Sequence, residues 1–425
     1  MNGNLYFASN VHTYAGAFTI TMMIQICFYY FELYDFKVFK SNLELMIRLL
    51  QSLGSALIVL ASIYCFIPNI MPGRGEFLLA LVLIGVTVIC WRLLYNEFLK
   101  MKYVDQRILI LGTGNMAKNI AEKALGDSGF KVIGFTAAEP DRIGESLVNP
   151  CIIGTHSEIN RLCDRYKVNR IIVANEERRG KLPLEQLMEC KTKGIKIEEG
   201  INFYEHIAGK IEVSHLHPCF IIFSDGFKKS RLVANTKRGY DLLFSIIGMI
   251  IAAPFLPVIA ILIKLDSRGP VFYKQERVGK NSKPFYLIKF RSMVQNSEKN
   301  GPTWAELQDT RVTRIGRILR KARIDEIPQL FNVVKGEMSL VGPRPERPHF
   351  VNKLREVIPY YDQRYCVAPG ITGWAQVRYP YGASYKDAEE KLKYDLYYIK
   401  NISIAFDLFI IFETIKIVLF RKGAR

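Results

Sequence analysis

The stretch Arg107-Ile-Leu-Ile-Leu-Gly112-Thr-Gly114-Asn-Met-Ala117 decides the fold of the middle of this chain. Its first half is a short apolar run of the kind that forms a buried parallel strand. Its second half, Gly-x-Gly-x-x-Ala, predicts a tight turn and the amino terminus of a helix. A strand that runs directly into a glycine turn and a helix is typical of the first unit of a doubly wound α/β domain.

Further strand candidates follow at regular intervals, each separated from the next by a segment of helix length. They are Lys131–Phe135, Arg170–Ala174 and Gly194–Glu198. Strands that alternate with helices in this way favour a parallel sheet. We therefore predict a Rossmann-like, doubly wound α/β domain over residues 103–215.

Gly112 and Gly114 are candidate cofactor-binding residues, because a helix amino terminus behind a glycine turn can hold a phosphate group. A dinucleotide fingerprint also needs an acidic residue about 20 positions further on, where it binds the ribose. Here the second strand candidate runs into Thr136, and Glu139 comes late. A redox role is therefore weakly supported. A regulatory nucleotide site and a purely structural spacer are the alternatives that we favour.

The composition indicates that apolar and charged residues occupy different parts of the chain. The 425 residues are 49% apolar and carry a net charge of +18. The mean hydropathy is +0.08 even though 23% of the residues are charged. This combination excludes a disordered chain, a collagen-like fibre and a small disulfide scaffold, and it argues against a simple soluble globule.

The first 102 residues contain three apolar runs, Thr13–Phe31, Leu50–Ile70 and Phe77–Trp91. Each approaches the roughly 20 residues that cross a bilayer core. Basic residues follow the first and third runs, which places the amino terminus outside and everything from about Lys102 in the cytosol. Buried core helices of a soluble domain are the alternative. A signal peptide is disfavoured because no Lys or Arg precedes Lys37.

A fourth apolar run, Leu242–Ile263, is long enough to span a membrane but contains Pro254 and Pro257. Proline removes a backbone donor and kinks a helix, so we expect a break at Ala253–Pro254. A straight crossing would also place residues 264–425 outside. We predict a re-entrant helix over residues 240–264 that enters one leaflet and returns. An ordinary fourth span with a kink is the alternative.

The chain becomes basic and rich in motifs after Val271, and Asp325-Glu326 beside Pro328 is its most informative element. Proline is favoured at the first position of a helix, so the acidic pair should lie just before a helix amino terminus. Adjacent carboxylates among basic side chains suit a phosphate substrate with a divalent metal. A solvated capping pair is the alternative. The basic residues are Lys289, Arg291, Arg320, Lys321 and Arg323.

Three longer phrases carry a resemblance to a known family. They are Lys289-Phe-Arg291-Ser-Met293, RIDEIPQLFNVVKGEMSLVGPRPE over residues 323–346 and PGITGWAQV over residues 369–377. On these motifs, residues 237–425 resemble the monotopic polyprenyl-phosphate phosphoglycosyl transferases, the bacterial sugar transferases. The closing run of the chain is similar to the exopolysaccharide branch associated with PEP-CTERM/exosortase systems.

The resemblance implies an enzyme, an undecaprenyl-phosphate sugar phosphotransferase that starts exopolysaccharide biosynthesis. Asp325 would attack the β-phosphate of a UDP-sugar, release UMP and hold the phosphosugar covalently until polyprenyl phosphate accepts it. Glu326 would complete the acidic dyad, and both carboxylates would bind Mg²⁺. Lys289 and Arg291 match the family's basic motif and count as catalytic candidates. Candidate substrate-binding residues are Pro343, Arg344, Asp395, Gln275 and Arg277.

The implied architecture is an α/β protein with membrane helices, which ends in an α-rich catalytic domain with the re-entrant helix. The expected domains are a transmembrane region over 1–102, the Rossmann-like domain over 103–215, a linker over 216–236 and the catalytic domain over 237–425. The enzyme would reside in the bacterial inner membrane with its catalytic domain on the cytosolic face. Its expected partners are a UDP-sugar, polyprenyl phosphate and the bilayer, with a homodimer and other exopolysaccharide assembly enzymes as further expectations; nucleic acid is not among them.

Two departures from the family pattern stand out. Family members often have Ser-Pro at the helix break where this chain has Ala253-Pro254, and larger members usually show four amino-terminal spans rather than three. Two other functions stay open at this stage. One is a nucleotide-sugar oxidoreductase or dehydratase that uses the middle domain, and the other is a membrane-bound scaffold that senses a ligand.

Overall fold

The computed structural model describes residues 2–33, 42–66, 106–126, 129–174, 182–213, 230–295, 310–379 and 384–420, together with the isolated positions 83, 86, 87, 90, 226, 227 and 382. The chain divides into two compact units, Met1–Val104 and Asp105–Arg425. The boundary lies two residues from the predicted end of the transmembrane region. The second unit contains both the predicted α/β domain and the predicted catalytic domain.

The first unit contains two described helices, α1 (Asn2–Tyr30) and α2 (Asn42–Phe66). They pack against each other through apolar side chains that include Ile24, Ala56 and Leu60. Within the described residues, two helical segments are long and apolar enough to cross a membrane, Ile47–Cys65 in α2 and Arg231–Asp266 in the second unit. The first predicted run, Thr13–Phe31, is helical and lies almost wholly in α1. The third predicted run lies almost wholly outside the described residues.

Arg48 precedes the apolar run Leu50–Ile70 in the sequence but belongs to the same helix as that run. It lies inside α2, and its Nη1 donates to Glu32 Oε2 at 2.7 Å. The helix therefore begins earlier than the apolar run that predicted it, because polar residues can extend a helix beyond its apolar part.

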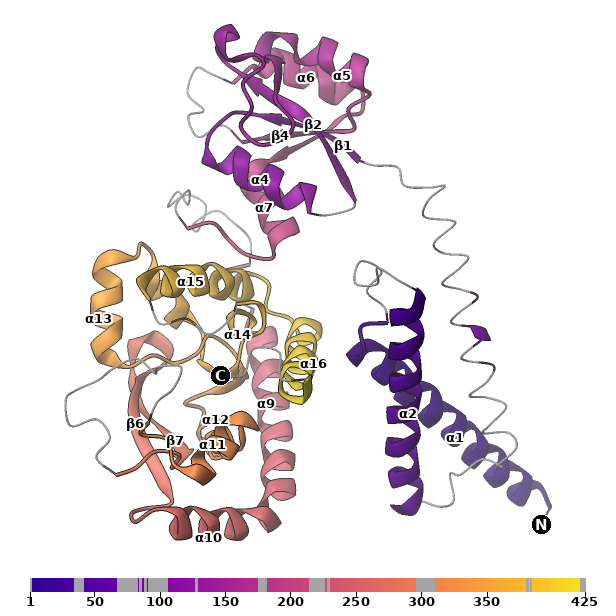
Figure 1. Ribbon diagram of the computed structural model, residues 1–425, viewed down its shortest axis with the longest axis vertical. Coiled ribbons are helices and arrows are strands. Elements are labelled where there is room, and N and C mark those ends of the chain that lie inside the picture. Colours follow the sequence, from indigo (N-terminus) through magenta and orange to yellow (C-terminus); the bar gives the residue numbers. More distant parts are fainter. Residues whose placement is uncertain are drawn as a thin grey trace. The chain divides into compact units, whose positions relative to one another are not determined.

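The second unit begins with a five-stranded, wholly parallel sheet in the order β3-β2-β1-β4-β5 (Figure 1). The order reverses at β1, and helices cover both faces. α4 and α7 pack on one face, and α5 and α6 on the other. The elements are β1 (Gln106–Leu111), α4 (Asn115–Leu125), β2 (Phe130–Ala137), η2 (Pro140–Arg142), β3 (Ile152–Thr155), η3 (His156–Glu158), α5 (Ile159–Tyr166), β4 (Arg170–Val173), α6 (Leu184–Thr192), β5 (Lys196–Glu199) and α7 (Gly200–Ala208).

The four strands predicted from sequence are all present as β1, β2, β4 and β5, and a parallel α/β sheet is confirmed. β3 was not predicted; it has only four residues and lies at the edge of the sheet. So short a run is hard to tell from a loop by its pattern alone.

The rest of the unit is mainly helical, as predicted, with an antiparallel hairpin, β6–β7, and a short parallel pair, β8–β9. The elements are α9 (Arg231–Ala252), η4 (Ala253–Phe255), α10 (Leu256–Asp266), β6 (Phe272–Val278), η5 (Lys280–Ser282), β7 (Pro284–Phe290), α11 (Arg314–Lys321), η6 (Ile324–Glu326), α12 (Gln329–Lys335), β8 (Ser339–Val341), α13 (Pro348–Val357), η7 (Tyr361–Cys366), β9 (Gly370–Thr372), α14 (Trp374–Arg378), α15 (Tyr385–Lys400) and α16 (Ile404–Phe420).

The fourth apolar run is broken at the predicted place. α9 ends at Ala252, a 3-10 turn holds Pro254, and α10 continues from Leu256 in a clearly different direction (Figure 1). Large apolar side chains along the pair face outward, as shown by Ile251 and Leu265, which are 63% and 79% exposed. Exposure on this scale is typical of a surface that meets lipid or another apolar partner.

The segment after α7 packs onto the helical region rather than ending as a free linker. Ile211 and Val213 are buried in a core that includes Val351 and Leu392. The Ile211 amide donates to the carbonyl of Lys393 at 3.1 Å. The predicted linker over 216–236 lies partly outside the described residues, and its last six residues belong to α9.

Candidate active site

The acidic dyad lies in the 3-10 turn η6, directly before α12. Arg323 opens the turn in the left-handed region with φ 54, and Pro328 forms the N-cap position of α12. Asp325 and Glu326 are both buried, at 7% and 8% exposure. The position just before a helix amino terminus agrees with the prediction from Pro328.

Glu326 holds two cations that come from distant parts of the chain. Lys289 Nζ, from β7, and Arg344 Nη2 each donate to Glu326 Oε1 at 3.0 Å. Burial alone would raise the pKa of Glu326, but the positive charges of Lys289 and Arg344 outweigh it and hold the pKa well below its usual range. Glu326 therefore favours the anionic form and binds both Lys289 and Arg344 at the dyad.

Asp325 differs from its neighbour. Within the described part of the chain its carboxylate accepts no hydrogen bond. Burial raises the pKa of Asp325, and the positive charge of Lys289 opposes that rise. A carboxylate with uncommitted lone pairs beside fixed cations can attack an electrophilic centre such as a phosphorus atom.

The segment Pro343–Glu346 brings Arg344 to the dyad. The Gly370 amide donates to the carbonyl of Pro343 at 2.9 Å. Arg277 Nη1 donates to the carbonyl of Pro345 at 2.9 Å. Two of the predicted substrate-binding residues thus have structural contacts here, because Pro343 shapes the segment and Arg277 supports it.

Gln275 contacts Arg277 and not the dyad within the described residues. Its Oε1 accepts from Arg277 Nη2 at 2.5 Å, and its Nε2 donates to the Tyr273 hydroxyl at 3.1 Å. Among the described contacts Gln275 reaches the site only through Arg277. A direct role for Gln275 in substrate binding stays a prediction.

Asp395 is paired inside the protein. It is 1% exposed, and its Oδ2 accepts from Arg364 Nη2 at 2.9 Å. Burial raises the pKa of Asp395 to about 6, although the guanidinium of Arg364 opposes the rise. The same Nη2 also donates to the carbonyl of Arg344 at 3.0 Å. The sequence analysis missed Arg364, because a lone arginine in a run of polar and aromatic residues carries no motif.

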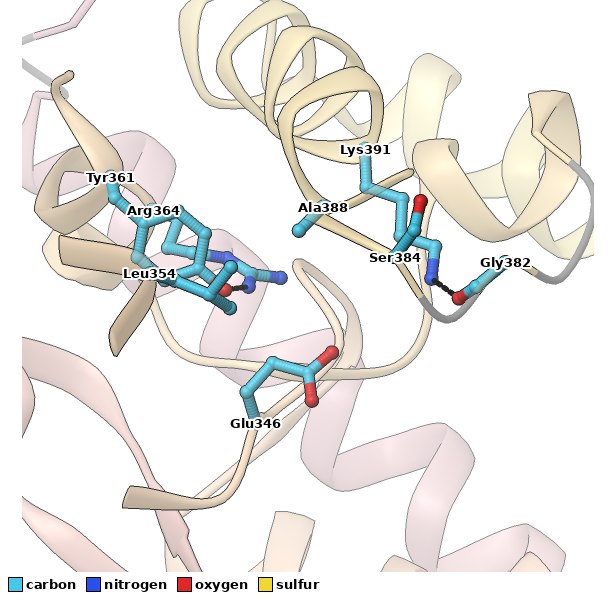
Figure 2. A pocket seen from close by; sticks show the side chains of 8 residues that line it. All are labelled: Glu346, Leu354, Tyr361, Arg364, Gly382, Ser384, Ala388 and Lys391. Carbon is cyan, nitrogen blue, oxygen red and sulfur yellow. Dashed lines mark hydrogen bonds between the residues drawn. The ribbon is translucent and has the colours of Figure 1, made fainter. Parts of the chain in front are cut away.

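A small polar pocket lies beside this pair. Figure 2 shows the Glu346 carboxylate and the Arg364 guanidinium pointing toward the same space, with Lys391 across from them. Lys391 Nζ donates to the carbonyl of Gly382 at 2.7 Å. The pocket adjoins the Pro343–Glu346 segment, since it is lined by the last residue of that segment.

Arg291 is placed at the end of α10 rather than on the dyad. Its Nη2 donates to the carbonyl of Ser267 at 2.6 Å and to the Ser267 hydroxyl at 2.9 Å. It also reaches the carbonyl of Ile263 at 3.3 Å. These contacts satisfy carbonyls at a helix end, which is a structural function. A catalytic role for Arg291 stays a prediction.

Gly112 and Gly114 form the predicted turn between β1 and α4. Gly112 has φ 119, a conformation that favours glycine, and Gly114 is the N-cap of α4. Arg142 Nη1 donates to the Thr113 hydroxyl at 2.7 Å, within the same turn. The turn lies between β1 and α4 as predicted, and phosphate binding at Gly112 and Gly114 stays a prediction.

Known proteins with similar sequences point to one family. Residues 232–421 match the profile of a family described as bacterial sugar transferase. The chain is 44% identical over 239 residues to the UDP-N-acetylgalactosamine-undecaprenyl-phosphate N-acetylgalactosaminephosphotransferase of Aeromonas hydrophila, a match that covers 56% of each chain. It therefore spans about half the length of that relative.

Two further relatives differ in length. The undecaprenyl-phosphate glucose phosphotransferase of Komagataeibacter xylinus is 45% identical over 194 residues, which are 44% of this chain and 36% of that protein. The exopolysaccharide production protein PSS of Rhizobium leguminosarum bv. phaseoli is 43% identical over 188 residues, which are 42% of this chain but 92% of that protein. The match with this shorter relative thus covers almost its whole length. The chain belongs to the bacterial sugar transferase family.

Proposed function

We propose that this protein transfers a sugar 1-phosphate from a UDP-sugar to undecaprenyl phosphate and releases UMP, as the first membrane step of exopolysaccharide biosynthesis. One observation carries the proposal. Asp325 keeps its carboxylate uncommitted within the described residues, while Glu326 beside it fixes Lys289 and Arg344 at 3.0 Å each. The names of the relatives from Aeromonas and Komagataeibacter point to the same substrate class.

In the first step a carboxylate oxygen of Asp325 forms a bond to the β-phosphorus of the UDP-sugar. The bond from that phosphorus to the oxygen that bridges to the α-phosphate breaks, and UMP leaves with the bridging oxygen. Negative charge accumulates on the diphosphate oxygens, where Lys289 and Arg344 can stabilise it. The sugar phosphate then remains on Asp325 as an acyl phosphate.

In the second step a phosphate oxygen of undecaprenyl phosphate attacks the same phosphorus. The bond to Asp325 breaks, and the residue returns to a carboxylate. The product is a sugar linked to the lipid through a diphosphate. No proton has to be removed from either nucleophile, because the carboxylate and the lipid phosphate are already anions. A general base is therefore not required.

Mg²⁺ is the metal that we propose for this site. Within the described residues, no group of three or more His, Cys, Asp or Glu side chains could hold a metal ion. Asp325 and Glu326 nevertheless fit Mg²⁺, which is usually held by one or two carboxylates together with substrate phosphates. When bound there, the ion would neutralise charge on the diphosphate.

We also propose that α9 and α10 form a re-entrant pair. Arg238, near the start of α9, donates to the carbonyls of Val333 and Val334 at 2.5 and 2.8 Å. At the other end, Arg291 holds the carbonyl of Ser267, and Asp266 accepts from the Ile315 amide at 2.9 Å. Both ends of the pair are thus tied to the same helical region, so the two ends belong on one side of a membrane.

The exposed apolar side chains between those two ends would then lie in one leaflet. We propose that the catalytic region then lies at the cytosolic face of the inner membrane, where nucleotide sugars occur. Cysteine labelling tests it with Arg268→Cys and Ser230→Cys in a chain without its native cysteines. Both positions should react from the cytosolic side only. Labelling of Arg268→Cys from the opposite side would refute the re-entrant pair.

The parallel sheet is proposed to be a Rossmann-like domain with a structural or regulatory role. Its strand order reverses at β1, next to the turn of Gly112 and Gly114, as in dinucleotide-binding folds. β2 ends at Ala137 without an acidic residue. This sequence favours a role other than hydride transfer.

Incubation of the full chain with radiolabelled UDP-sugars and Mg²⁺, without lipid acceptor, tests the reaction. UDP-N-acetylgalactosamine, UDP-glucose and UDP-galactose serve as donors. We expect UMP release and label bound to the protein, and neither in Asp325→Asn. Asp362→Asn makes the same chemical change on the surface and should behave like the wild type. Label transfer with UDP as the product would refute the mechanism, and chelation of Mg²⁺ should stop the reaction reversibly.

A further inference from the structure

The main chain of the segment Pro343–Glu346 is held in place through its carbonyl groups. It contains neither helix nor strand, and its two prolines have no amide hydrogen to donate. Four consecutive carbonyls each accept one hydrogen bond, and the donors come from different parts of the chain. The donors are the Gly370 amide to Pro343 at 2.9 Å, Arg364 Nη2 to Arg344 at 3.0 Å, Arg277 Nη1 to Pro345 at 2.9 Å and the Val278 amide to Glu346 at 3.0 Å.

Arg364 holds the one carbonyl that belongs to Arg344 itself. The side chain of Arg364 is 5% exposed, and the Tyr361 hydroxyl accepts from its Nη1. Its Nη2 is shared between the Arg344 carbonyl and Asp395 Oδ2, at 3.0 and 2.9 Å. A buried guanidinium without a counter-charge is strongly unfavourable, so Asp395 keeps Arg364 in this position.

A continuous chain of contacts therefore leads from α15 to the dyad. Asp395 binds Arg364, Arg364 binds the backbone of Arg344, and the side chain of Arg344 donates to Glu326 at 3.0 Å. Both members of the buried pair act on Arg344 through its main chain, which leaves the Arg344 guanidinium available to the dyad.

We propose that Arg364 and Asp395 are positioning residues that aim the Arg344 guanidinium at Glu326 and at the substrate diphosphate. The inference rests on the proposed function, because Arg344 is taken to stabilise charge on the transferred phosphate. It reassigns Asp395 from substrate contact to support of another residue. It also adds Arg364 to the machinery of the site.

A second buried pair on the same helix supplies a matched control. Lys393, two residues before Asp395, bonds to Glu212 at 2.6 Å, and the two side chains are 13% and 5% exposed. Glu212 follows the parallel sheet, and this pair joins α15 to the segment after α7. Glu212→Gln and Asp395→Asn are the same kind of change, so a general loss of α15 packing would affect them alike.

A double-mutant cycle on UMP release tests the proposal. Arg344→Ala should lower kcat/KM by about 100-fold or more, as removal of a charge-stabilising donor does. Asp395→Asn alone should lower it by about 10- to 100-fold through misplacement of Arg344. In the Arg344→Ala background, Asp395→Asn should have almost no further effect, because the group it positions is gone. Arg364→Lys serves as a second variant if Asp395→Asn folds poorly.

Deuterium exchange provides a readout that does not depend on turnover. The amides of Gly370 and Val278 donate to carbonyls of the segment, and they should exchange faster in Asp395→Asn than in Glu212→Gln, since only the first loosens the segment. Additive effects in the cycle, or equal exchange in the two variants, would overturn the positioning role. A wild-type protein that releases no UMP would refute the proposed function instead, and the exchange result would still decide the positioning role.

Discussion

Two turns of the second unit, Gly112–Gly114 and η6, each lead into a helix, and they differ in whether their polar groups are already bonded. In the turn at Gly112–Gly114, the nearby cation is already engaged, since Arg142 donates to Thr113 and to Glu145. In η6, the carboxylate of Asp325 has no hydrogen bond within the described residues.

The difference between the two turns shows that a backbone conformation alone does not make a chemical site. A glycine motif specifies a particular backbone conformation, and many domains use that conformation for packing alone. The two carboxylates of the dyad instead differ in their partners. Glu326 binds the cations Lys289 and Arg344, and Asp325 keeps its carboxylate uncommitted within the described residues. The predictions below test this contrast, beginning with the largest expected effect.

Asp325→Asn should abolish transfer, with kcat/KM lower by about 1,000-fold or more, because the amide cannot form the covalent intermediate. Gly114→Ala, in the other turn, should leave kcat/KM within about twofold, since φ −75 at this position suits alanine. UMP release measures both. Comparable losses in the two variants would mean that the glycine turn takes part in the reaction.

Lys289→Met should lower kcat/KM by about 100-fold, because one of the two cations at the dyad is lost. Lys393→Met is the control, since this lysine is also bound to a buried carboxylate but lies away from the dyad. The control should lose stability and keep its rate per folded molecule. Equal rate losses would show that Lys289 acts only through folding.

Asp395 should give stability a particular dependence on pH. Its pKa is about 6 in the folded protein and about 4 in an unfolded chain, so between these values the folded state binds the extra proton. The free energy of unfolding of the wild type should fall relative to Asp395→Asn by about 2 kcal/mol as pH rises through this window. Above about pH 6 the two curves should run parallel.

Denaturant unfolding in detergent, repeated from pH 4 to pH 7, measures this dependence. Asp362→Asn, at an exposed position, should run parallel to the wild type throughout. A difference between wild type and Asp395→Asn that is constant over this range would contradict the raised pKa.

Arg142→Ala should have the smallest effect. Its bond to Glu145 joins two exposed side chains, and pairs of this kind contribute little to stability. Turnover should stay within about twofold of the wild type. A large loss of turnover would place the glycine turn in the catalytic machinery and remove the contrast between the two turns.

Much of the fold could be predicted because local rules produce it. Four of the five parallel strands were predicted from short runs that alternate with segments of helix length, and the fourth apolar run breaks at the predicted position, Pro254. The edge strand β3 was missed because four residues carry too little pattern. The position of the dyad before α12 followed from Pro328.

The contacts of the site were harder to predict. Arg291 lies two residues from Lys289, yet Lys289 reaches Glu326 while Arg291 reaches Ser267. Arg291 directly follows β7, beyond the last residue that the hairpin pairs. The partner of each side chain depends on the elements that pack around it. Hydrophobic periodicity in the sequence does not indicate that partner.

The sequence by itself determined the segments and their conformations, since apolar runs, glycine turns and prolines act on neighbours within a few residues. Only the tertiary structure decided that Lys289 and Arg344, 37 and 18 residues from Glu326, share one carboxylate oxygen. It alone joined Arg364 to Asp395 and to the backbone of Arg344. Such contacts form when separate elements pack together and leave buried charges that only one another can satisfy.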